Sequence, residues 1–314
     1  MTTPKQHLLQ KTSVVWICAL ICTALWGSAF PCIKTGYVLF QIPSSDTSSQ
    51  ILFAGLRFFL AGLLTILIGS IGQRRFLIPK PSSGPKVFVL SMFQTVIQYL
   101  LFYIGLAHTT GVKGSILGGT SVLFSILIAC LIFRQETFSS SKLAGCLIGF
   151  AGIVIVNLNG AGMELGFTFT GEGFMILSAL SYALSSIFFK RFSSDDDPVT
   201  LSGYQFLLGG LIMIIIGGAS GGRISILGVS SILLLIYMAL ISAVAYSLWG
   251  MLLKYNPVSK ITVFGFMTQV FGVLLSALIL KEQGGFGPRT LLALILVCMG
   301  IYLVNKSKKT PSCG

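Results

Sequence analysis

Ten apolar runs, each long enough to cross a bilayer as a helix, dominate this sequence of 314 residues. A membrane-spanning helix needs about 20 consecutive, mainly apolar residues. The predicted spans cover residues 13–37, 51–71, 87–107, 112–133, 142–158, 173–192, 199–218, 227–248, 261–280 and 291–304. Only 9% of the residues are charged, against about a quarter in soluble proteins. We therefore expect an all-α integral membrane protein with ten transmembrane helices and an apolar surface that faces lipid.

The basic residues indicate the orientation of these spans. The formal net charge is +13, from 21 Lys and Arg against 8 Asp and Glu. With a cytoplasmic N-terminus, the two tails and the even-numbered loops carry fifteen of the basic residues and the odd-numbered loops carry four. Because Lys and Arg keep short loops on the cytoplasmic side, both termini are predicted to be cytoplasmic. Nucleic acid is not expected as a partner, because the basic residues are dispersed over many short segments.

Four pairs of matching segments suggest an internal repeat. Residues 26–34 (WGSAFPCIK) match 182–190 (YALSSIFFK), and 55–62 (GLRFFLAG) match 203–210 (GYQFLLGG). The stretches that run into Glu136 and Glu282 also match, as do GIVIVN and GIYLVN near the ends of the fifth and tenth spans. Because a five-helix unit has an odd number of spans, its second copy enters from the other side, which makes the halves inverted repeats. The predicted organisation is a tail at 1–12, repeats at 13–159 and 171–305, and a tail at 306–314.

These features resemble the EamA family of the drug/metabolite transporter (DMT) superfamily. The resemblance rests on W-G-S-x-F with Lys34 in the first span, L-R-F in the second, a Glu after the fourth and ninth, and G-x-x-x-x-N endings on the fifth and tenth. It implies a secondary carrier in the plasma membrane of a bacterium, with a central cavity between the repeats. Family members often have a proline in the middle of the fourth and ninth spans, which this chain lacks.

The expected function is transport of small organic metabolites, amino acids or related solutes, by an exporter or exchanger that works by alternating access. A channel-like facilitator and a metabolite uptake carrier are the alternatives. An enzyme is not expected: no catalytic residue, metal site or cofactor is predicted, because no His or carboxylate lies at membrane depth. The expected partners are a small-molecule solute and the lipid bilayer. Protons as a coupling ion and a homodimer both stay open.

With the basic residues at the span ends counted in the loops, Lys34 and Arg57 are the cations inside predicted spans, and both lie toward the outer side. A charge at the centre of a bilayer costs about 2.5 to 3.5 kcal/mol on insertion scales, so something must offset it. One reading is that the two residues attract an anionic group of the solute. The other is that Lys34 extends to the interface and Arg57 binds helix carbonyls.

Polar and aromatic residues within the spans complete the predicted binding site. They are Trp26, Ser28, Gln94, Gln98, Tyr99, Tyr182, Tyr246, Trp249 and Gln269. At helical spacing, Gln94 and Gln98 share one face, as do Tyr99 and Tyr103. The alternatives are hydrogen bonds between helices for the glutamines, and an interfacial belt for Tyr103 and Trp249.

Energy coupling is predicted mainly from what the sequence lacks. No G-x-x-x-x-G-K-[ST] motif is present, so ATP drive within this chain is not expected. Glu136 and Glu282 occupy corresponding places in the two repeats. We expect them to stabilise loop turns and pair with Arg134 or Lys281, and a role in proton transfer is the alternative.

Overall fold

The computed structural model describes residues 8–157, 167–225, 228–281 and 287–306. None of these residues forms a strand, and ten helical spans are long and apolar enough to cross a membrane. The spans are Thr12–Leu39, Thr47–Gln73, Pro81–Ala107, Lys113–Ile132, Ser140–Asn157, Phe169–Phe192, Pro198–Ala219, Val229–Tyr255, Val258–Leu280 and Pro288–Lys306. The prediction of an all-helical protein with ten spans is confirmed. Residues 158 and 227, the predicted repeat boundary at 159, most of both tails, and Glu282 lie outside the described residues.

Several spans contain more than one helical element. The elements are η1 (Leu8–Gln10), α1 (Thr12–Leu39), α2 (Thr47–Gln73), η2 (Pro81–Ser83), α3 (Gly84–Leu90), η3 (Ser91–Val96), α4 (Ile97–Ala107), α5 (Gly111–Leu127), η4 (Ile128–Ile132), α6 (Ser140–Asn157), η5 (Phe169–Gly173), α7 (Phe174–Phe192), α8 (Pro198–Ala219), α9 (Val229–Tyr255), α10 (Val258–Thr262), α11 (Gly265–Leu280) and α12 (Pro288–Lys306). The segments η3, η4 and η5 are π-helical. Such wide turns change the direction in which the following side chains point.

Short polar residues fix where helices begin. The Asp46 carboxylate caps α2 by accepting hydrogen bonds from the Ser49 amide at 3.0 Å and the Ser49 hydroxyl at 2.6 Å. The Asp197 carboxylate caps α8 by accepting from the Thr200 amide at 2.8 Å, with Pro198 in the first turn. Both choices are those that helix N-termini favour.

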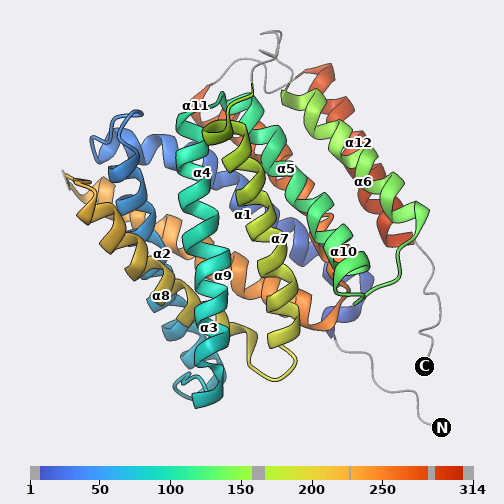
Figure 1. Ribbon diagram of the computed structural model, residues 1–314, viewed down its shortest axis with the longest axis horizontal. Coiled ribbons are helices and arrows are strands. Elements are labelled where there is room, and N and C mark those ends of the chain that lie inside the picture. Colours follow the sequence, from blue (N-terminus) through green and yellow to red (C-terminus); the bar gives the residue numbers. More distant parts are fainter. Residues whose placement is uncertain (1–7, 158–166, 226–227, 282–286, 307–314) are drawn as a thin grey trace.

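Pairs of helices form two opposite edges of the bundle, α2 with α8 and α6 with α12 (Figure 1). The backbones of α2 and α8 approach so closely that a Cβ placed on Gly62 would lie 2.8 Å from the Gly203 carbonyl oxygen. A Cβ on Gly210 would lie 2.9 Å from the Gly55 oxygen. Small residues allow such packing in membranes. The contact is reciprocal in the predicted alignment, because Gly55 corresponds to Gly203 and Gly62 to Gly210.

The other edge repeats this arrangement. A Cβ on Gly145 would lie 2.7 Å from the Gly300 oxygen, and one on Gly152 would lie 2.9 Å from the Ala293 oxygen. Gly152 corresponds to Gly300 in the predicted alignment, so the contact is again reciprocal. A two-fold relation between the halves would produce this pattern at both edges.

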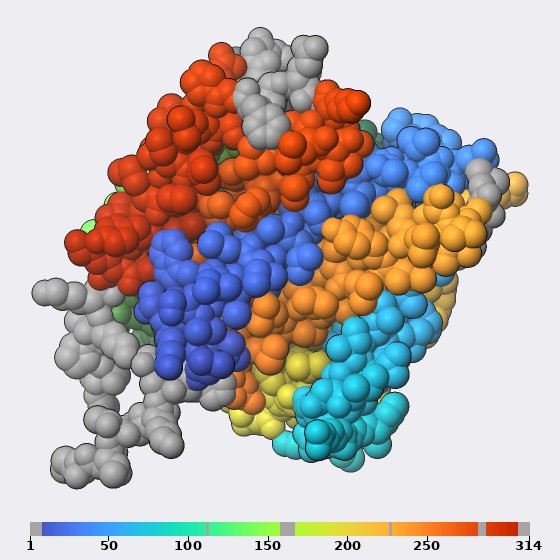
Figure 2. Space-filling model, turned by 180° about the vertical axis from the view of Figure 1, so that it is seen from behind, coloured from blue at the N-terminus to red at the C-terminus, as the bar shows by residue number. Residues whose placement is uncertain are grey.

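Between the edges, α1 lies against α9 and α11, and Figure 2 shows it in dark blue across one face of the molecule. The loops divide between the two ends of the bundle. We call the end that carries residues 74–80, 133–139, 193–197 and 256–257 the basic face. The end that carries residues 40–46, 108–110 and 220–225 is the opposite face. Hydrogen bonds join separate loops at each end, for example Lys80 to the Asp195 carbonyl and the Ser225 amide to the Phe40 carbonyl.

Candidate functional site

A cavity of about 200 Å³ lies among seven of the ten spans, with walls from both halves of the chain. Its lining comes from α1, α2, α4, α5, α7, α9 and α11. Seven of the predicted site residues line it: Trp26, Arg57, Gln98, Tyr99, Tyr182, Tyr246 and Gln269. Trp26 and Tyr182, which the repeat alignment matches, thus lie on the same cavity. That these residues bind a solute stays a prediction.

The cavity is displaced toward the opposite face. Along α1, which starts at the basic face, the lining begins only at Trp26, and along the third span it begins at Gln98. Along α7 and α9, which end at the basic face, it stops at Tyr182 and Tyr246. The remaining turns toward the basic face are packed, and Trp249 there is only 1% exposed. The packed half therefore closes the cavity on the basic side.

Arg57 is the charged residue in the cavity wall. Its side chain on α2 is 4% exposed, and its guanidinium carbon lies 4.3 Å from the centre of the Phe58 ring and 5.8 Å from that of Tyr99. Within the described part of the chain no hydrogen bond or ion pair reaches it, and its Nε is buried without a partner. The predicted alternative for Arg57, hydrogen bonds to helix carbonyls, is therefore not found among these residues. Among the described residues, the rings of Phe58 and Tyr99 are the groups placed to stabilise this cation.

Aromatic side chains make the cavity wall beside Arg57. The hydroxyls of Tyr99 and Tyr246 are 3.1 Å apart and connect the third span to the eighth. The Trp26 ring lies 4.8 Å from Tyr246 and 4.9 Å from Trp249, between centroids. Tyr103 also lines the cavity and is 2% exposed, so the interfacial-belt reading of Tyr103 is wrong. Spacing within α4 places Tyr99 and Tyr103 together as predicted.

Two amides add polar groups. Gln269 on α11 accepts a hydrogen bond from the Ser115 hydroxyl at 2.8 Å, which joins the fourth and ninth spans. The Oε1 atom of Gln98 is buried and has no hydrogen-bond partner. A buried amide without a partner is unfavourable unless a ligand satisfies it.

Four predicted site residues lie away from the cavity lining. Lys34 follows the lining residue Ile33 but is exposed on the outside of the bundle. Ser28 donates to the Leu25 carbonyl and lies 3.2 Å from the Tyr237 hydroxyl, and Trp249 packs behind Trp26. Lys34 and Arg57 thus both lie toward the outer side of their spans, but of the two residues Arg57 lines the cavity and Lys34 does not.

Gln94 is the fourth of these residues, and a π-helical turn explains its position. It is 3% exposed and lies in η3, whereas Gln98 lies in the α-helix that follows. Hydrogen bonds from i to i+5 insert an extra residue into the turn, so four-residue spacing no longer keeps two side chains on one face. Gln98 lines the cavity and Gln94 does not, for that reason.

Several lining residues carry no signal that could be recognised in the sequence. Phe102, Met175, Ser178, Met238 and Ser242 belong to runs of ordinary apolar and small residues. The Ser178 hydroxyl donates to the Gln98 carbonyl at 2.7 Å and so fastens α7 against α4. Serines at three- or four-residue spacing on an apolar helix are the nearest available hint, because they can bond to a neighbouring helix.

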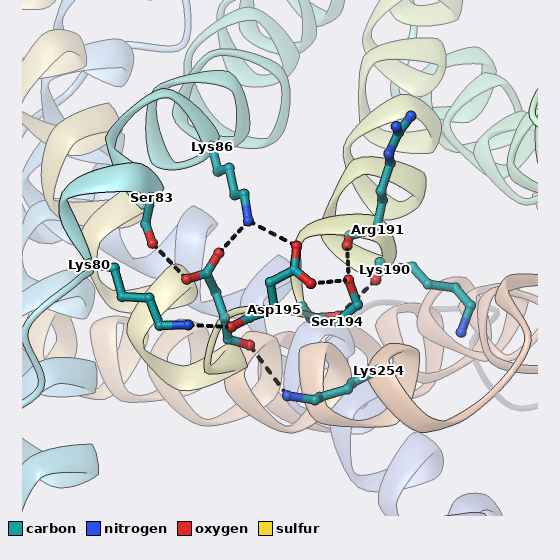
Figure 3. Close-up of polar contacts among 10 residues, drawn as sticks. Lys80, Ser83, Lys86, Lys190, Arg191, Ser194, Asp195 and Lys254 are labelled. Carbon is teal, nitrogen blue, oxygen red and sulfur yellow. Dashed lines mark hydrogen bonds and ion pairs between the residues drawn. The ribbon is translucent and has the colours of Figure 1, made fainter.

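A polar network links lysines, serines and aspartates at the basic face (Figure 3). Lys86 contacts Asp195 at 3.3 Å and Asp196 at 2.7 Å, and Asp196 also accepts from the Ser83 hydroxyl at 2.6 Å. Lys80 and Lys254 donate to the backbone carbonyls of Asp195 and Asp196. A hollow of about 370 Å³ lies here, lined by residues of this network. Burial alone would raise the pKa of the Asp196 carboxyl, but the bonds from Lys86 and Ser83 and the charges of Lys86 and Lys80 hold that pKa below its usual value.

Glu136 makes a second connection between the halves at this face. Its carboxylate accepts from the Ser259 amide at 3.1 Å and from the Ser259 hydroxyl, and it pairs with Lys142 at 2.9 Å. The expected pairing with Arg134 is wrong: Lys142, one turn into α6, is the partner that the fold brings near. Its repeat counterpart Glu282 lies outside the described residues.

Comparisons with known proteins agree with this architecture. A family model described as the EamA-like transporter family matches residues 14–158 and 169–306. A protein of Archaeoglobus fulgidus named "Uncharacterized transporter" is 27% identical over 93% of this chain and 99% of its own length. Uncharacterized transporter YvbV of Bacillus subtilis is 24% identical, over 96% of this chain and 94% of its own.

More distant similarities extend the comparison. A chloroplastic WAT1-related protein of Arabidopsis thaliana is 24% identical over 94% of this chain and 70% of its own. A crystal structure matches with a TM-score of 0.75 at 15% identity, covering 93% of this chain and 96% of the other. At that identity the structural match supports the fold alone.

Proposed function

Because this chain belongs to the EamA-like transporter family, we propose that it is a secondary transporter of small organic metabolites that works by alternating access. The observation that carries the proposal is the cavity with walls from both halves, closed at the basic face and displaced toward the opposite face. A solute held there is separated from the basic side. Inverted repeats supply a second conformation of opposite orientation, in which the same site faces the basic side.

The reciprocal glycine contacts at both edges of the bundle support the inverted repeat. We place the protein in the plasma membrane of a bacterium, with both termini in the cytoplasm and the basic face on that side. The charge distribution of the loops supports this orientation. Labelling of single cysteines introduced into the loops of intact cells tests it.

An exporter or exchanger is the mode of transport that we propose. A channel-like facilitator and an uptake carrier are its rivals. The test is counterflow in proteoliposomes, with labelled amino acids and related carboxylates outside and an excess of the unlabelled solute inside. Transient, saturable accumulation of label supports a carrier. Flux that does not saturate supports a facilitator, and the dependence of flux on the orientation of the protein separates export from uptake.

Filling the cavity gives a matched control. A side chain at Gly118 points into the cavity, where the nearest atom to its Cβ is the Gln269 amide nitrogen at 3.8 Å. Gly218 on α8 is exposed and has no atom within 4 Å of its Cβ. Gly118→Phe is expected to abolish counterflow and Gly218→Phe to retain it. Equal transport by both variants would contradict the proposal that this cavity is the transport site.

Proton coupling and dimerisation are further parts of the expectation. Counterflow that drives a change in internal pH, and loss of accumulation with an uncoupler, would support protons as the coupling ion. The mass of the solubilised particle tests the homodimer. Conversion of the solute into a product would instead indicate that the protein is a membrane-embedded enzyme.

A further inference from the structure

The charge of the central cavity comes from one side chain. Among the described residues that line it, Arg57 is the charged one, and no Asp or Glu is present. A guanidinium stays protonated at any accessible pH. The cavity therefore holds a permanent positive charge at a site that is 4% exposed.

Two hydrogen-bond donors of cavity-lining residues lack partners among the described residues. Arg57 Nε and Trp26 Nε1 are both buried without a hydrogen-bond partner, and both residues line the cavity. A desolvated guanidinium with an unpartnered N–H suits an acceptor that carries negative charge, and a carboxylate is the common group of that kind in small metabolites. The buried Gln98 oxygen can accept a further hydrogen bond from a hydroxyl or N–H group of the same solute.

The carboxylate nearest in sequence to a lining residue is already occupied. Glu172 lies one turn before Met175, and its two oxygens accept hydrogen bonds from Lys113 at 2.9 Å, Thr109 at 2.7 Å and the Thr168 amide at 2.7 Å. Glu172 is not among the cavity-lining residues. An ammonium group in the cavity would thus meet a like charge and no described carboxylate.

The walls limit the size and character of the rest of the solute. Trp26, Tyr99, Phe102, Tyr182 and Tyr246 present aromatic surface, which favours a planar or branched apolar body. A volume of about 200 Å³ is below the range of about 300 to 1,000 Å³ of drug-sized ligand sites. The space suits a solute with a single ring or a short branched chain.

We propose that the cavity selects small monocarboxylates with an aromatic or branched apolar body, and that it discriminates against the amino acids and amines that share this body. This inference rests on the proposed function. The carboxylate contacts Arg57, and the apolar body contacts the aromatic wall. The added ammonium of an amino acid is repelled by Arg57 and finds no carboxylate in the described lining. Selectivity thus follows net charge as well as shape.

Calorimetric titration of the full-length protein with two matched series tests this selectivity. One series is phenylacetate, phenylalanine and phenethylamine, and the other is 4-methylpentanoate, leucine and 3-methylbutylamine. We expect the carboxylate of each series to bind at least about thirtyfold more tightly than its amino acid, the size of effect typical of a desolvated charge contact. The amines are expected not to bind. Equal or tighter binding of the amino acids, or failure of both carboxylates to bind folded protein, overturns the proposal.

Variants assign the selectivity to Arg57. Arg57→Gln is expected to remove the preference for the carboxylate, and Arg57→Lys to keep it in part, because a lysine retains the charge but not the planar fork. Lys34→Gln, a cation outside the cavity, is the control and is expected to bind like the parent. A preference that survives Arg57→Gln overturns the proposal, provided that the variant elutes as a folded monodisperse particle.

Counterflow distinguishes this inference from the proposed function. Binding of the carboxylates without counterflow means that the proposed class of ligand is right and the carrier proposal fails. Saturable counterflow of phenylalanine in preference to phenylacetate means that the carrier proposal is right and the proposed class of ligand is wrong.

Discussion

Buried charges at the basic face and in the central cavity have opposite surroundings. At the basic face, the Asp196 and Glu136 carboxylates are each satisfied by a lysine and by a serine from the other half of the chain. In the cavity, Arg57 meets only aromatic faces within the described part of the structure. Satisfied charges hold the halves together, whereas an unsatisfied charge leaves interaction energy available for a solute. On this contrast we expect the basic face to act as a seal and the cavity to be the proposed binding site.

The largest expected effect comes from breaking the seal. Glu136→Ala leaves the buried Lys142 ammonium without its carboxylate, and removing one partner of a buried pair costs about 3 to 5 kcal/mol. We expect lower stability in an SDS titration followed by circular dichroism, and faster maleimide labelling of Cys130, which is 6% exposed beside Lys142. Unchanged labelling and stability would mean that this pair does not seal the face. Glu136→Gln, which retains a hydrogen-bond acceptor, is the milder control.

A matched pair of aspartates sharpens the contrast within the seal. Both carboxylates contact Lys86, but the Asp195 side chain is 71% exposed and the Asp196 side chain 6%. Asp196→Asn is expected to lower the free energy of unfolding by about 1 to 3 kcal/mol, and Asp195→Asn to change it by less than about 0.5 kcal/mol. Similar losses in the two variants, measured in the same SDS titration, would show that burial does not govern this network.

Removing the cavity charge is expected to raise the free energy of unfolding, whereas the variants at the basic face lower it. Arg57→Met replaces a buried cation that has no counterion by an apolar side chain, which can stabilise a protein even though the contact with Phe58 is lost. We expect a gain of about 1 kcal/mol in unfolding free energy together with loss of carboxylate binding. A clear loss of stability would mean that Arg57 is a structural residue and would remove the contrast between the basic face and the cavity.

The smallest effect is a pH dependence. The pKa of Asp196 is lowered in the folded protein, so its contribution to stability is complete above the unfolded value of about 3.9 and is lost as the pH falls through the folded pKa. The stability difference between the parent and Asp196→Asn should therefore be constant from about pH 7 to 5 and shrink below about pH 4. A difference that shrinks already near pH 6 would point to another titrating group.

The sequence was sufficient for the spans and for part of the site. Apolar runs of bilayer length predicted the ten helices, and a cation within a span identified Arg57. Spacing in a regular helix placed Tyr99 and Tyr103 together. It failed for Gln94, because no residue pattern announces the π-helical turn of η3. It did not decide between the two readings of Lys34, because a position along a span does not specify which side of the helix faces the cavity.

Contacts between distant segments were the least predictable part. The bond from Ser178 to the Gln98 carbonyl and the contact of Glu136 with Ser259 depend on how the two halves dock. Neither residue type nor local spacing encodes that docking. The matching glycines were visible as a repeat in the sequence, but that they pack against one another emerged only from the fold.

The glycine contacts at the two edges also matter for biosynthesis. A ribosome completes α2 and α6 before α8 and α12, so the surfaces around Gly62 and Gly145 enter the bilayer before the helices that cover them exist. During that interval each surface meets lipid or another newly made chain. Synthesis of the first half alone would leave both surfaces uncovered. A second five-helix half has surfaces complementary to these two and could cover both.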